Sequence, residues 1–308
     1  MKAVVVNNWV ERIDELRVDK NAPEPKLEEN QVLVEVKATA LNFFDILQVQ
    51  GKYQEKPPLP FIPGVEKYKV GDRIFGVGNG CFAERATVDV DSSHLIPSGM
   101  NYEEAAGLYV TYPTSYAALA FRAKLREGEW CLVHAAAGGV GIAAVQFAKA
   151  LGAKVIATCG SEEKLVIAKR FGADYGINYN EKDWHKQVLK ITGGHGVEVV
   201  YDPVGLIRSS IRCLGGEIEK IPANLILVKN ISILGFYWGS YKRNEPERIP
   251  DVWREIFKLI AEKKVKSVVY EKIYHGLDSV KDGMNAIYRR ETYGKAIVIP
   301  GSSRESKI

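Results

Sequence analysis

The sequence is poor in the residues that mark disulfide-stabilised, metal-binding and membrane-spanning proteins. Its 308 residues include four cysteines and five histidines, scattered along the chain without a Cys-x-x-Cys pair. This spacing excludes a disulfide framework and shows no metal-ligand cluster. We therefore interpret the cysteines as small core residues of a protein in a reducing compartment. No apolar run approaches the length needed to cross a bilayer.

A large excess of charge is also lacking. The formal net charge is only +4 at pH 7, which does not indicate a dedicated nucleic-acid or membrane surface. Hydrophobic residues make up 46% of the chain and charged residues 26%, which is typical of a soluble globular protein of one large or two smaller domains. The strand-like start, residues 1–6, leaves no room for a signal peptide, so we expect a cytoplasmic protein.

The most informative stretch that is present reads as strand, turn, helix and strand. Residues 130–133 are apolar, residues 135–141 are only Ala, Gly and Val, and an apolar stripe at helical spacing follows as far as Leu151. A second strand is predicted at residues 154–159. This order is typical of a dinucleotide-binding unit rather than a plain turn, and backbone N–H groups of its turn would bind a pyrophosphate. The expected cofactor contacts are Ala137, Gly138, Gly139, Val140 and Gly141.

The flanking segments predict a second, β-rich domain. Strands are expected at residues 4–6, 31–40 and within 70–85, and a helical run from about 103 to 120 is expected to bridge the two domains. A buried strand is expected at residues 197–201, where it runs into a turn, and the last strand of the nucleotide domain is expected at residues 231–237. The chain then continues with helices at 251–260 and 277–288 and a strand at 294–300. We predict domain segments 1–110, 111–238 and 239–308, the third returning to the first.

Six short motifs resemble the quinone oxidoreductase (zeta-crystallin-like) branch of the medium-chain dehydrogenase/reductase superfamily. They span nearly the whole chain in the family's order and lie at 40–45, 50–53, 63–66, 69–76, 135–141 and 201–205. The resemblance implies an α/β fold, with a doubly wound parallel Rossmann domain and a mostly β, GroES-like catalytic domain formed by both chain ends. It also implies a homodimer through the edge strand Ile231–Tyr237.

The family has zinc-dependent and zinc-free branches, and two positions separate them. The zinc branch would place a cysteine near Asn42 and a histidine at the position of Val65. Neither an amide nor an isopropyl group supplies the expected thiolate or imidazole ligand. The four-cysteine structural lobe is missing too, so the sequence predicts an enzyme without zinc. No flavin is expected.

The end of the second nucleotide-domain strand predicts NADPH rather than NADH. Residues 158–161 hold no Asp or Glu to accept the ribose hydroxyls of NADH, and Lys164 follows at once. The resemblance implies that Ser161, Lys164 and Tyr179 form the pocket of the 2′-phosphate. On the other interpretation, Lys164 is a solvated helix charge. Ser161 is also predicted to cap the helix that contains Lys164.

Further cofactor contacts are implied by the resemblance alone. Thr114 would approach the nicotinamide, although a helix hydroxyl can equally bond its own backbone. The turn that contains Pro203 would lie against the nicotinamide, as would Phe236 and Tyr237. Lys295 matches a position near the adenosine phosphate.

The expected activity is NADPH-dependent reduction of quinones or related α,β-unsaturated carbonyls. Tyr53 is the candidate to bond the acceptor oxygen or donate the proton, and Asn42 would position the nicotinamide or the carbonyl. The alternatives are a loop-packing tyrosine and a turn-capping asparagine. Two rival functions remain open: an enoyl-thioester (enoyl-CoA) reductase, and a non-catalytic crystallin-like or RNA-binding protein.

Three places depart from the family pattern or extend beyond it. After Glu66 and after Leu214 the chain lacks segments that the family has, and the loss of an inner strand would expose unpaired backbone groups. We therefore expect residues to be missing from the numbered sequence at both places. The final Ser306-Lys307-Ile308 resembles a peroxisomal address, with a disordered polar tail as the alternative.

Overall fold

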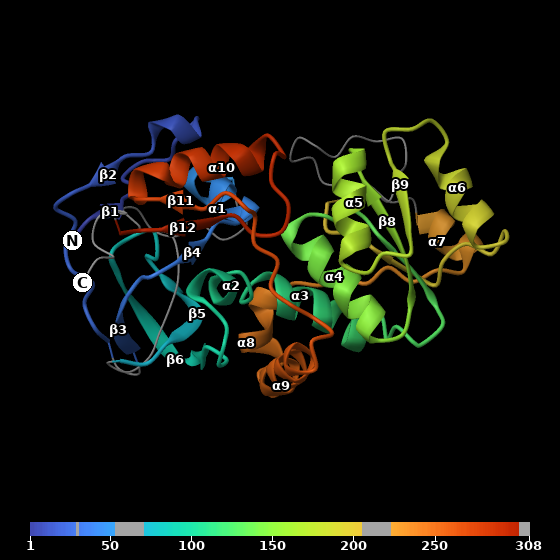
Figure 1. Cartoon of the computed structure of the whole chain (residues 1–308), viewed down its shortest axis with the longest axis horizontal. Helices are drawn as coiled ribbons and strands as arrows, with labels where there is room; N and C mark the ends of the chain where they lie inside the picture. The colour runs from blue at the N-terminus through green and yellow to red at the C-terminus, as the bar shows by residue number, and fades with distance from the viewer. Residues whose placement is uncertain (29–30, 53–70, 205–222, 302–308) are drawn as a thin grey trace. The chain divides into compact units, whose positions relative to one another are not determined.

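The computed structural model describes residues 1–28, 31–52, 71–204 and 223–301. The chain forms two compact units (Figure 1). The first consists of Met1–Tyr109 and Ser267–Ile308, and the second of Val110–Lys266. The blue and red ends of the colour range therefore share the first unit, as expected for a catalytic domain formed by both chain ends. Tyr53, Glu66, Leu214 and the terminal Ser306–Ile308 lie outside the described residues.

The strands of the first unit form three small sheets. An antiparallel sheet has the order β3 (Gln31–Glu35), β6 (Arg85–Leu95), β5 (Ile74–Asn79), and a mixed one the order β11 (Tyr274–His275), β12 (Ile297–Ile299), β4 (Thr39–Ala40). A two-stranded sheet pairs β1 (Ala3–Val4) with β2 (Val18–Asp19). The predicted single strand 31–40 is two strands because β3 pairs with β6, whereas β4 pairs with β12.

The first unit also contains short helices. They are η1 (Ile13–Glu15), α1 (Phe43–Val49), α2 (Tyr102–Ala106), η4 (Leu277–Ser279) and α10 (Val280–Tyr288). Helix α1 packs on α10, and their core includes Leu41, Ile46 and Met284. The approach is close, because a Cβ on Gly283 would lie 2.3 Å from the Leu41 side chain.

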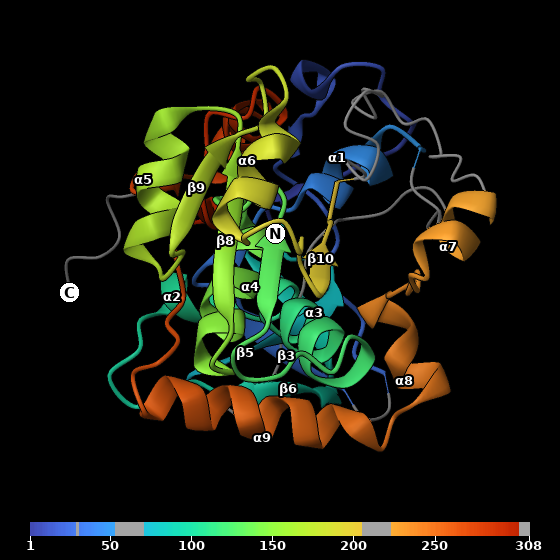
Figure 2. The same ribbon diagram turned by 90° about the vertical axis from the view of Figure 1, so that its right-hand side faces the viewer.

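The second unit contains a parallel sheet of the order expected for dinucleotide binding. Its order is β10 (Val199–Tyr201), β7 (Trp130–Val133), β8 (Lys154–Cys159), β9 (Tyr175–Asn178). Read from β9 to β10, the strands stand third, second, first, fourth in the chain order of this unit, which is the arrangement of a Rossmann half. Helices α4 (Gly139–Ala150), α5 (Glu162–Arg170) and α6 (Trp184–Ile191) contact its strands (Figure 2). The predicted fold class is confirmed.

The helical run predicted at 103–120 is broken between α2 and α3 (Thr111–Ala117), which a π-helical turn, Ala118–Arg122, extends. At the break, a Cβ on Gly107 would lie 2.7 Å from the Ser267 hydroxyl. The returning chain therefore approaches the backbone too closely for a larger residue. The structure changes from one unit to the other here, between Tyr109 and Val110.

The chain leaves the second unit at Lys266, not at residue 239. Between these positions it forms η3 (Trp238–Ser240), α8 (Tyr241–Asn244) and α9 (Arg248–Ala261), after α7 (Ala223–Lys229). Helix α9 contacts α3 and α8, and it buries Val252, Trp253 and Ile256. The amphipathic pattern correctly predicts a helix here, but the surface that covers its apolar face belongs to the second unit.

Two strand predictions at the edge of the nucleotide sheet need correction. Residues 231–237 belong to no helix or strand, and Ile231 and Leu234 are 51% and 55% exposed. The segment contains β-branched residues, but it pairs with no strand in the part of the chain that the structure describes. A strand requires such a hydrogen-bonded neighbour. The strand β10 does form, but Val200 is 48% exposed because β10 is the edge strand among those described. It is therefore not the buried strand predicted.

Candidate dinucleotide-binding site

The turn between β7 and α4 packs tightly against itself. Ala135 has a positive φ of 48°, and its carbonyl accepts a hydrogen bond from Gly138 N at 2.9 Å. A Cβ on Gly141 would lie 2.3 Å from that same carbonyl oxygen, so only glycine fits there. The glycine at this position lets the first turn of α4 approach the end of β7.

The N-terminus of α4 has the properties of an anion site. Its N-cap residue, Gly138, provides no side-chain oxygen, and no side chain caps it. The first N–H groups of a helix have no partner within the helix, and the helix dipole makes this end positive. Residues 137–141 stand at this end, where a pyrophosphate binds in dinucleotide folds.

The ends of β7 and β10 meet at the point where the strand order reverses. His134 N donates to Tyr201 O at 3.0 Å, which joins the residue after β7 to the last residue of β10. Beyond Tyr201 the chain turns, with Val204 N donating to Asp202 Oδ1 at 3.0 Å. The exposed Pro203 is therefore at the carboxyl edge of the sheet, beside the switch point where ligands bind in such folds.

His134 is a residue of this edge that the sequence interpretation did not select. Its side chain is 2% exposed, Nδ1 lies 2.7 Å from Thr158 Oγ1, and the ring meets Trp184 edge-on at 5.5 Å. Burial lowers its pKa, and the Asp202 carboxylate opposes this effect. The ring thus ties the end of β7 to the end of β8. The available signal was one polar residue at the end of an apolar run.

Three predicted residues follow the ends of two neighbouring strands, Ser161 and Lys164 after β8 and Tyr179 after β9. Ser161 caps α5 as predicted, its Oγ accepting from Lys164 N at 3.5 Å. The Tyr179 ring lies against Gly160, since a Cβ on Gly160 would be 2.9 Å from the tyrosine oxygen. Ser161, Lys164 and Tyr179 are all half-buried, so ligands can reach them.

The acids nearest to this group are on the helix, not on the strand. Glu162 and Glu163 are both exposed in the first turn of α5. The pKa of Glu163 is lowered, first by a bond from its own backbone N–H and then by the Ser161 side chain. This carboxylate therefore serves the helix terminus. The strand itself ends at Cys159 and is followed by Gly160 and Ser161.

Asn42 of the first unit is held between two buried charges. Lys295 Nζ donates to Asn42 Oδ1 at 2.5 Å and to Leu41 O at 2.9 Å. On the other side, Asn42 N donates to Asp45 Oδ2 at 2.6 Å, and Asn42 Nδ2 lies 3.3 Å from the same oxygen. Burial raises the pKa of Asp45 to about 6 and lowers that of Lys295 to about 8, and each charge partly offsets the effect on the other.

Comparisons with known proteins agree with this architecture. Residues 139–261 match the zinc-binding dehydrogenase family, a range that lies within the second unit and includes neither Asn42 nor Val65. A quinone oxidoreductase-like protein 2 homolog from Nematostella vectensis is 35% identical over 299 residues, which cover 87% of this chain and 81% of the relative. The chain belongs to the quinone oxidoreductase branch of the medium-chain dehydrogenase/reductase superfamily. It is therefore an oxidoreductase.

Two further relatives extend the comparison. The crystal structure of Escherichia coli quinone oxidoreductase complexed with NADPH has a TM-score of 0.86 and 28% identity, covering 97% of this chain and all of that one (100%). A highly reducing polyketide synthase from Didymella fabae is 31% identical over 79% of this chain, which corresponds to 14% of that much longer protein.

Several residues expected to bind the cofactor of this oxidoreductase already have partners within the chain. Lys295 is only 5% exposed and belongs to the first unit, where Leu41 O and Asn42 hold it. Its contact with an adenosine phosphate stays a prediction. Thr114 Oγ1 donates to Val110 O at 2.5 Å, the backbone bond expected on the alternative interpretation. Phe236 packs on Tyr241 with 5.4 Å between ring centroids, and Tyr237 is 40% exposed.

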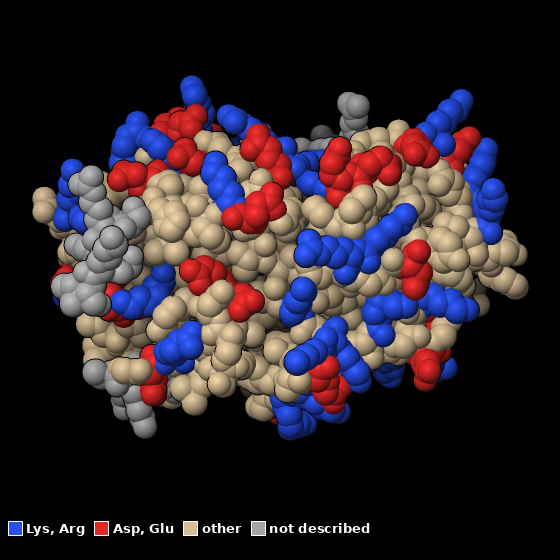
Figure 3. Space-filling model, viewed as in Figure 1, with Lys and Arg blue, Asp and Glu red and all other residues tan. Residues whose placement is uncertain are grey.

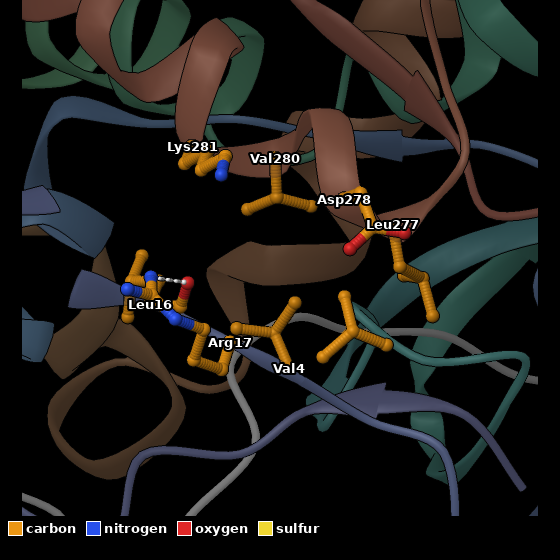
Figure 4. Close-up of a pocket in the computed structure, with 8 residues that line it drawn as sticks. Val4, Leu16, Arg17, Leu277, Asp278, Val280 and Lys281 are labelled. Atoms are coloured by element: carbon orange, nitrogen blue, oxygen red, sulfur yellow. Dashed lines mark hydrogen bonds between the residues drawn. The ribbon is translucent and has the colours of Figure 1, made fainter. Parts of the chain in front are cut away.

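A small pocket of the oxidoreductase's first unit is separate from all these residues (Figure 4). Apolar Leu16, Leu277 and Val280 line it, together with charged Arg17, Asp278 and Lys281. In Figure 4 the segment Leu16–Arg17 faces Val280 and Lys281 at the start of α10. Because none of the predicted site residues lines it, we assign it no part in the reaction.

The described ranges contain neither a metal-ligand cluster nor a membrane-spanning helix. No three His, Cys, Asp or Glu side chains within them are close enough together to hold a metal ion. No helix among these residues has both the length and the apolar character needed to cross a membrane.

Proposed function

We propose that the chain is a zinc-independent, NADPH-dependent reductase of quinones or related α,β-unsaturated carbonyls. The observation that carries the cofactor choice is the end of β8. An NADH site places an acid there to accept ribose hydroxyls, and that acid would repel a 2′-phosphate. Here Gly160 and Ser161 follow the strand instead, the Tyr179 ring lies against Gly160, and Lys164 lies in the first turn of α5. The NADPH complex of the E. coli relative supports the same choice.

The residues of the second unit fit the other parts of a dinucleotide. The Gly141 backbone lies where a Cβ would meet the Ala135 carbonyl, and α4 offers an uncapped N-terminus to the pyrophosphate. Pro203 stands at the switch point, where the nicotinamide half would pass. When bound, the reduced nicotinamide supplies the reducing equivalents. The chain's own part is to bind it, orient it and stabilise charge that develops on the acceptor oxygen.

Zinc independence is supported by what the Asn42 amide already binds. Where the zinc branch would have a thiolate, this chain has an amide bonded to a buried ammonium and a buried carboxylate. An amide in that environment is a poor ligand for Zn²⁺, which prefers thiolate and imidazole. Tyr53 remains our candidate to bond the acceptor oxygen, although it lies outside the described residues.

The test is NADPH oxidation with 1,2- and 1,4-quinones and with a short enoyl-CoA, each repeated with NADH. We expect quinone-dependent oxidation of NADPH, slower oxidation of NADH, and no effect of a zinc chelator on the rate. Quinone turnover with NADH alone would contradict the cofactor assignment. NADPH binding without turnover of either acceptor class would contradict the enzymatic proposal.

An enoyl-thioester reductase is the second candidate. The similarity to a reducing polyketide synthase favours it, because that relative's name describes reduction during polyketide synthesis. Oxidation of NADPH by the enoyl-CoA, with none by either quinone, would move the chain to this class.

A nucleic-acid-binding role is less favoured. Figure 3 shows positive and negative side chains mixed over one face of the molecule, without the one-signed surface that such a role needs. A salt-dependent gel shift with RNA would contradict this view.

A further inference from the structure

Three polar side chains stand in one row across the carboxyl edge of the parallel sheet. The registers place Val133 of β7 beside Ala157 of β8 and Tyr201 of β10. The residues that follow these three form the next row, and they are Thr158, His134 and Asp202. Side chains alternate along a strand between the two faces of a sheet, so this row belongs to the face opposite to that of Val133.

The middle residue of the row is bonded to the residue on β8. His134 Nδ1 lies 2.7 Å from Thr158 Oγ1, and these two residues are 2% and 0% exposed. The ring of Trp184, the first residue of α6, meets the His134 ring edge-on at 5.5 Å. Burial this complete keeps both side chains of the pair out of contact with a ligand.

Packing alone does not account for this polar pair. Two residues earlier on the same face, Leu132 and Ile156 share a hydrophobic core with Val188 of α6. Apolar side chains at positions 134 and 158 would extend this core without removing polar atoms from water. The hydrogen bond of the actual pair mainly offsets the cost of burying its own donor and acceptor. The use of the pair therefore lies at the other end of the row, at Asp202.

Asp202 connects the row to residues that a ligand can reach. Burial lowers the pKa of His134 and the Asp202 carboxylate raises it, an effect that requires the carboxylate to be near the ring. Asp202 Oδ1 also accepts a hydrogen bond from Val204 N at 3.0 Å, which closes a turn over Pro203. Pro203 and Val204 are both exposed. The carboxylate is therefore the link between a buried pair and an exposed turn.

We propose that Thr158 and His134 are positioning residues that fix the turn Asp202–Val204 for the nicotinamide half of NADPH. Nδ1 of the ring is engaged by Thr158, which leaves Nε2 to hold the Asp202 carboxylate. The exposed turn then has one orientation at the switch point of the sheet, where ligands bind in such folds. The inference rests on the proposed function and extends it to residues that the ligand does not touch. It concerns the second unit alone, since Val110–Lys266 contains the row, α6 and the turn.

The experiment measures the affinity of two ligands for the whole chain, as wild type and as His134→Leu. NADPH spans both halves of the site, whereas adenosine 2′,5′-bisphosphate has no nicotinamide nucleoside. We expect His134→Leu to weaken NADPH binding about tenfold, the effect of one hydrogen bond, and to leave the bisphosphate affinity unchanged. Leu132→Ala, a truncation on the same strand and the same face, is the matched control. It should lower the melting temperature and leave the ratio of the two affinities unchanged.

Two amide variants distinguish the two nitrogens of the ring. The side-chain amide of His134→Gln reaches the place of Nε2, whereas that of His134→Asn reaches only the place of Nδ1. We expect His134→Gln to bind NADPH within about twofold of the wild type, and His134→Asn to bind it as weakly as His134→Leu. Restoration by His134→Asn but not by His134→Gln would overturn the role of Asp202. If His134→Leu does not fold, the contrast between the two amide variants decides.

A double-variant cycle tests whether His134 acts through Asp202. On the background of Asp202→Ala, we expect His134→Leu to cause no further loss of NADPH affinity. Independent, additive losses would overturn the proposal. So would an unchanged NADPH affinity of His134→Leu, or an equal loss for the bisphosphate, which is the result of a merely structural role.

Failure of the proposed function gives a different result. In that case the wild type itself would not bind NADPH or would not reduce either acceptor class with it. Tight NADPH binding that is indifferent to the substitutions at position 134 would overturn only the role of His134 and Thr158.

Discussion

Lys164 and Asp45 are charged residues in opposite environments. Lys164 is half-buried at the start of α5, near Ser161, where a phosphate can reach it. Asp45 is 3% exposed, and its charge is compensated inside the first unit by Lys295 and Asn42. Substitution of the first is therefore expected to change ligand choice, and substitution of the second to change stability.

Lys164→Gln should raise the KM for NADPH roughly ten- to a hundredfold, because a charge-assisted bond to the 2′-phosphate is lost. The KM for NADH, which has no such phosphate, should stay the same. Steady-state kinetics with one quinone and both cofactors measures this. Lys169→Gln, an exposed lysine in the last turn of the same helix, is the control. Equal effects on both cofactors would exclude Lys164 from phosphate recognition.

Asp45→Asn should change how stability depends on pH. Burial raises the pKa of Asp45 from 3.8 to about 6, so between these values the folded state binds more protons than the unfolded state. Wild-type stability must therefore fall as pH rises through this window, by on the order of 2–3 kcal/mol from this group. The variant lacks this titration. In thermal unfolding from pH 4 to 7, the stability of the wild type should fall relative to that of Asp45→Asn. Parallel pH dependences of the two proteins would contradict the raised pKa of Asp45.

At the scale of elements, the β7–α4–β8 unit could be predicted because its determinants are local. The apolar strand, the small residues of the turn and the helical stripe follow one another within residues 130–159, and the structure forms each element there. The segment 231–237 has an equally strand-like composition, yet it is not a strand. A strand also depends on a neighbour that composition does not specify. The burial of β10 is equally hard to predict, because it depends on whether a further strand lies beside it.

Gly141→Ala should disrupt the β7–α4 turn. The new methyl group would lie 2.3 Å from the Ala135 carbonyl, so the turn must shift and the N–H groups of α4 with it. We expect a loss of about 1–3 kcal/mol in the free energy of unfolding and at least tenfold weaker NADPH binding. Gly138→Ala, whose Cβ would lie 3.3 Å from the same oxygen, should have a smaller effect. Denaturant titration and cofactor titration measure both, and a larger effect at Gly138 would contradict this geometry.

At the scale of the whole molecule, the cluster around Asn42 shows what sequence reasoning misses. Asn42 was selected, but its partner Lys295 is 253 positions away and was assigned to another role. Nothing in the local sequence around Gly294 indicates which residue the Lys295 side chain will contact. The division at residue 239 was also misplaced, because only the packed structure shows that α9 covers α3.

The exposed segment 231–237 supports the expectation of a homodimer, which we propose forms through it. Ile233 and Leu234 are 43% and 55% exposed, which is unusual for neighbouring aliphatic residues. Leu234→Asp should convert the dimer to a monomer in sedimentation velocity, because the charge would be buried without a partner. Val166→Asp, at a more exposed position on α5 (66%), should leave the dimer intact. A monomeric wild type would contradict the proposal.

The first unit is built from both ends of the chain, and this determines when it can form during synthesis. The ribosome releases Val110–Lys266, the whole second unit, before Ser267 and the segment that completes the first unit. Domains fold as units while the chain emerges, so the second unit can fold first although it is second in sequence. Asn42 and Asp45 are made early but must wait for Lys295. The second unit is thus the earlier to mature, and the first unit is completed last.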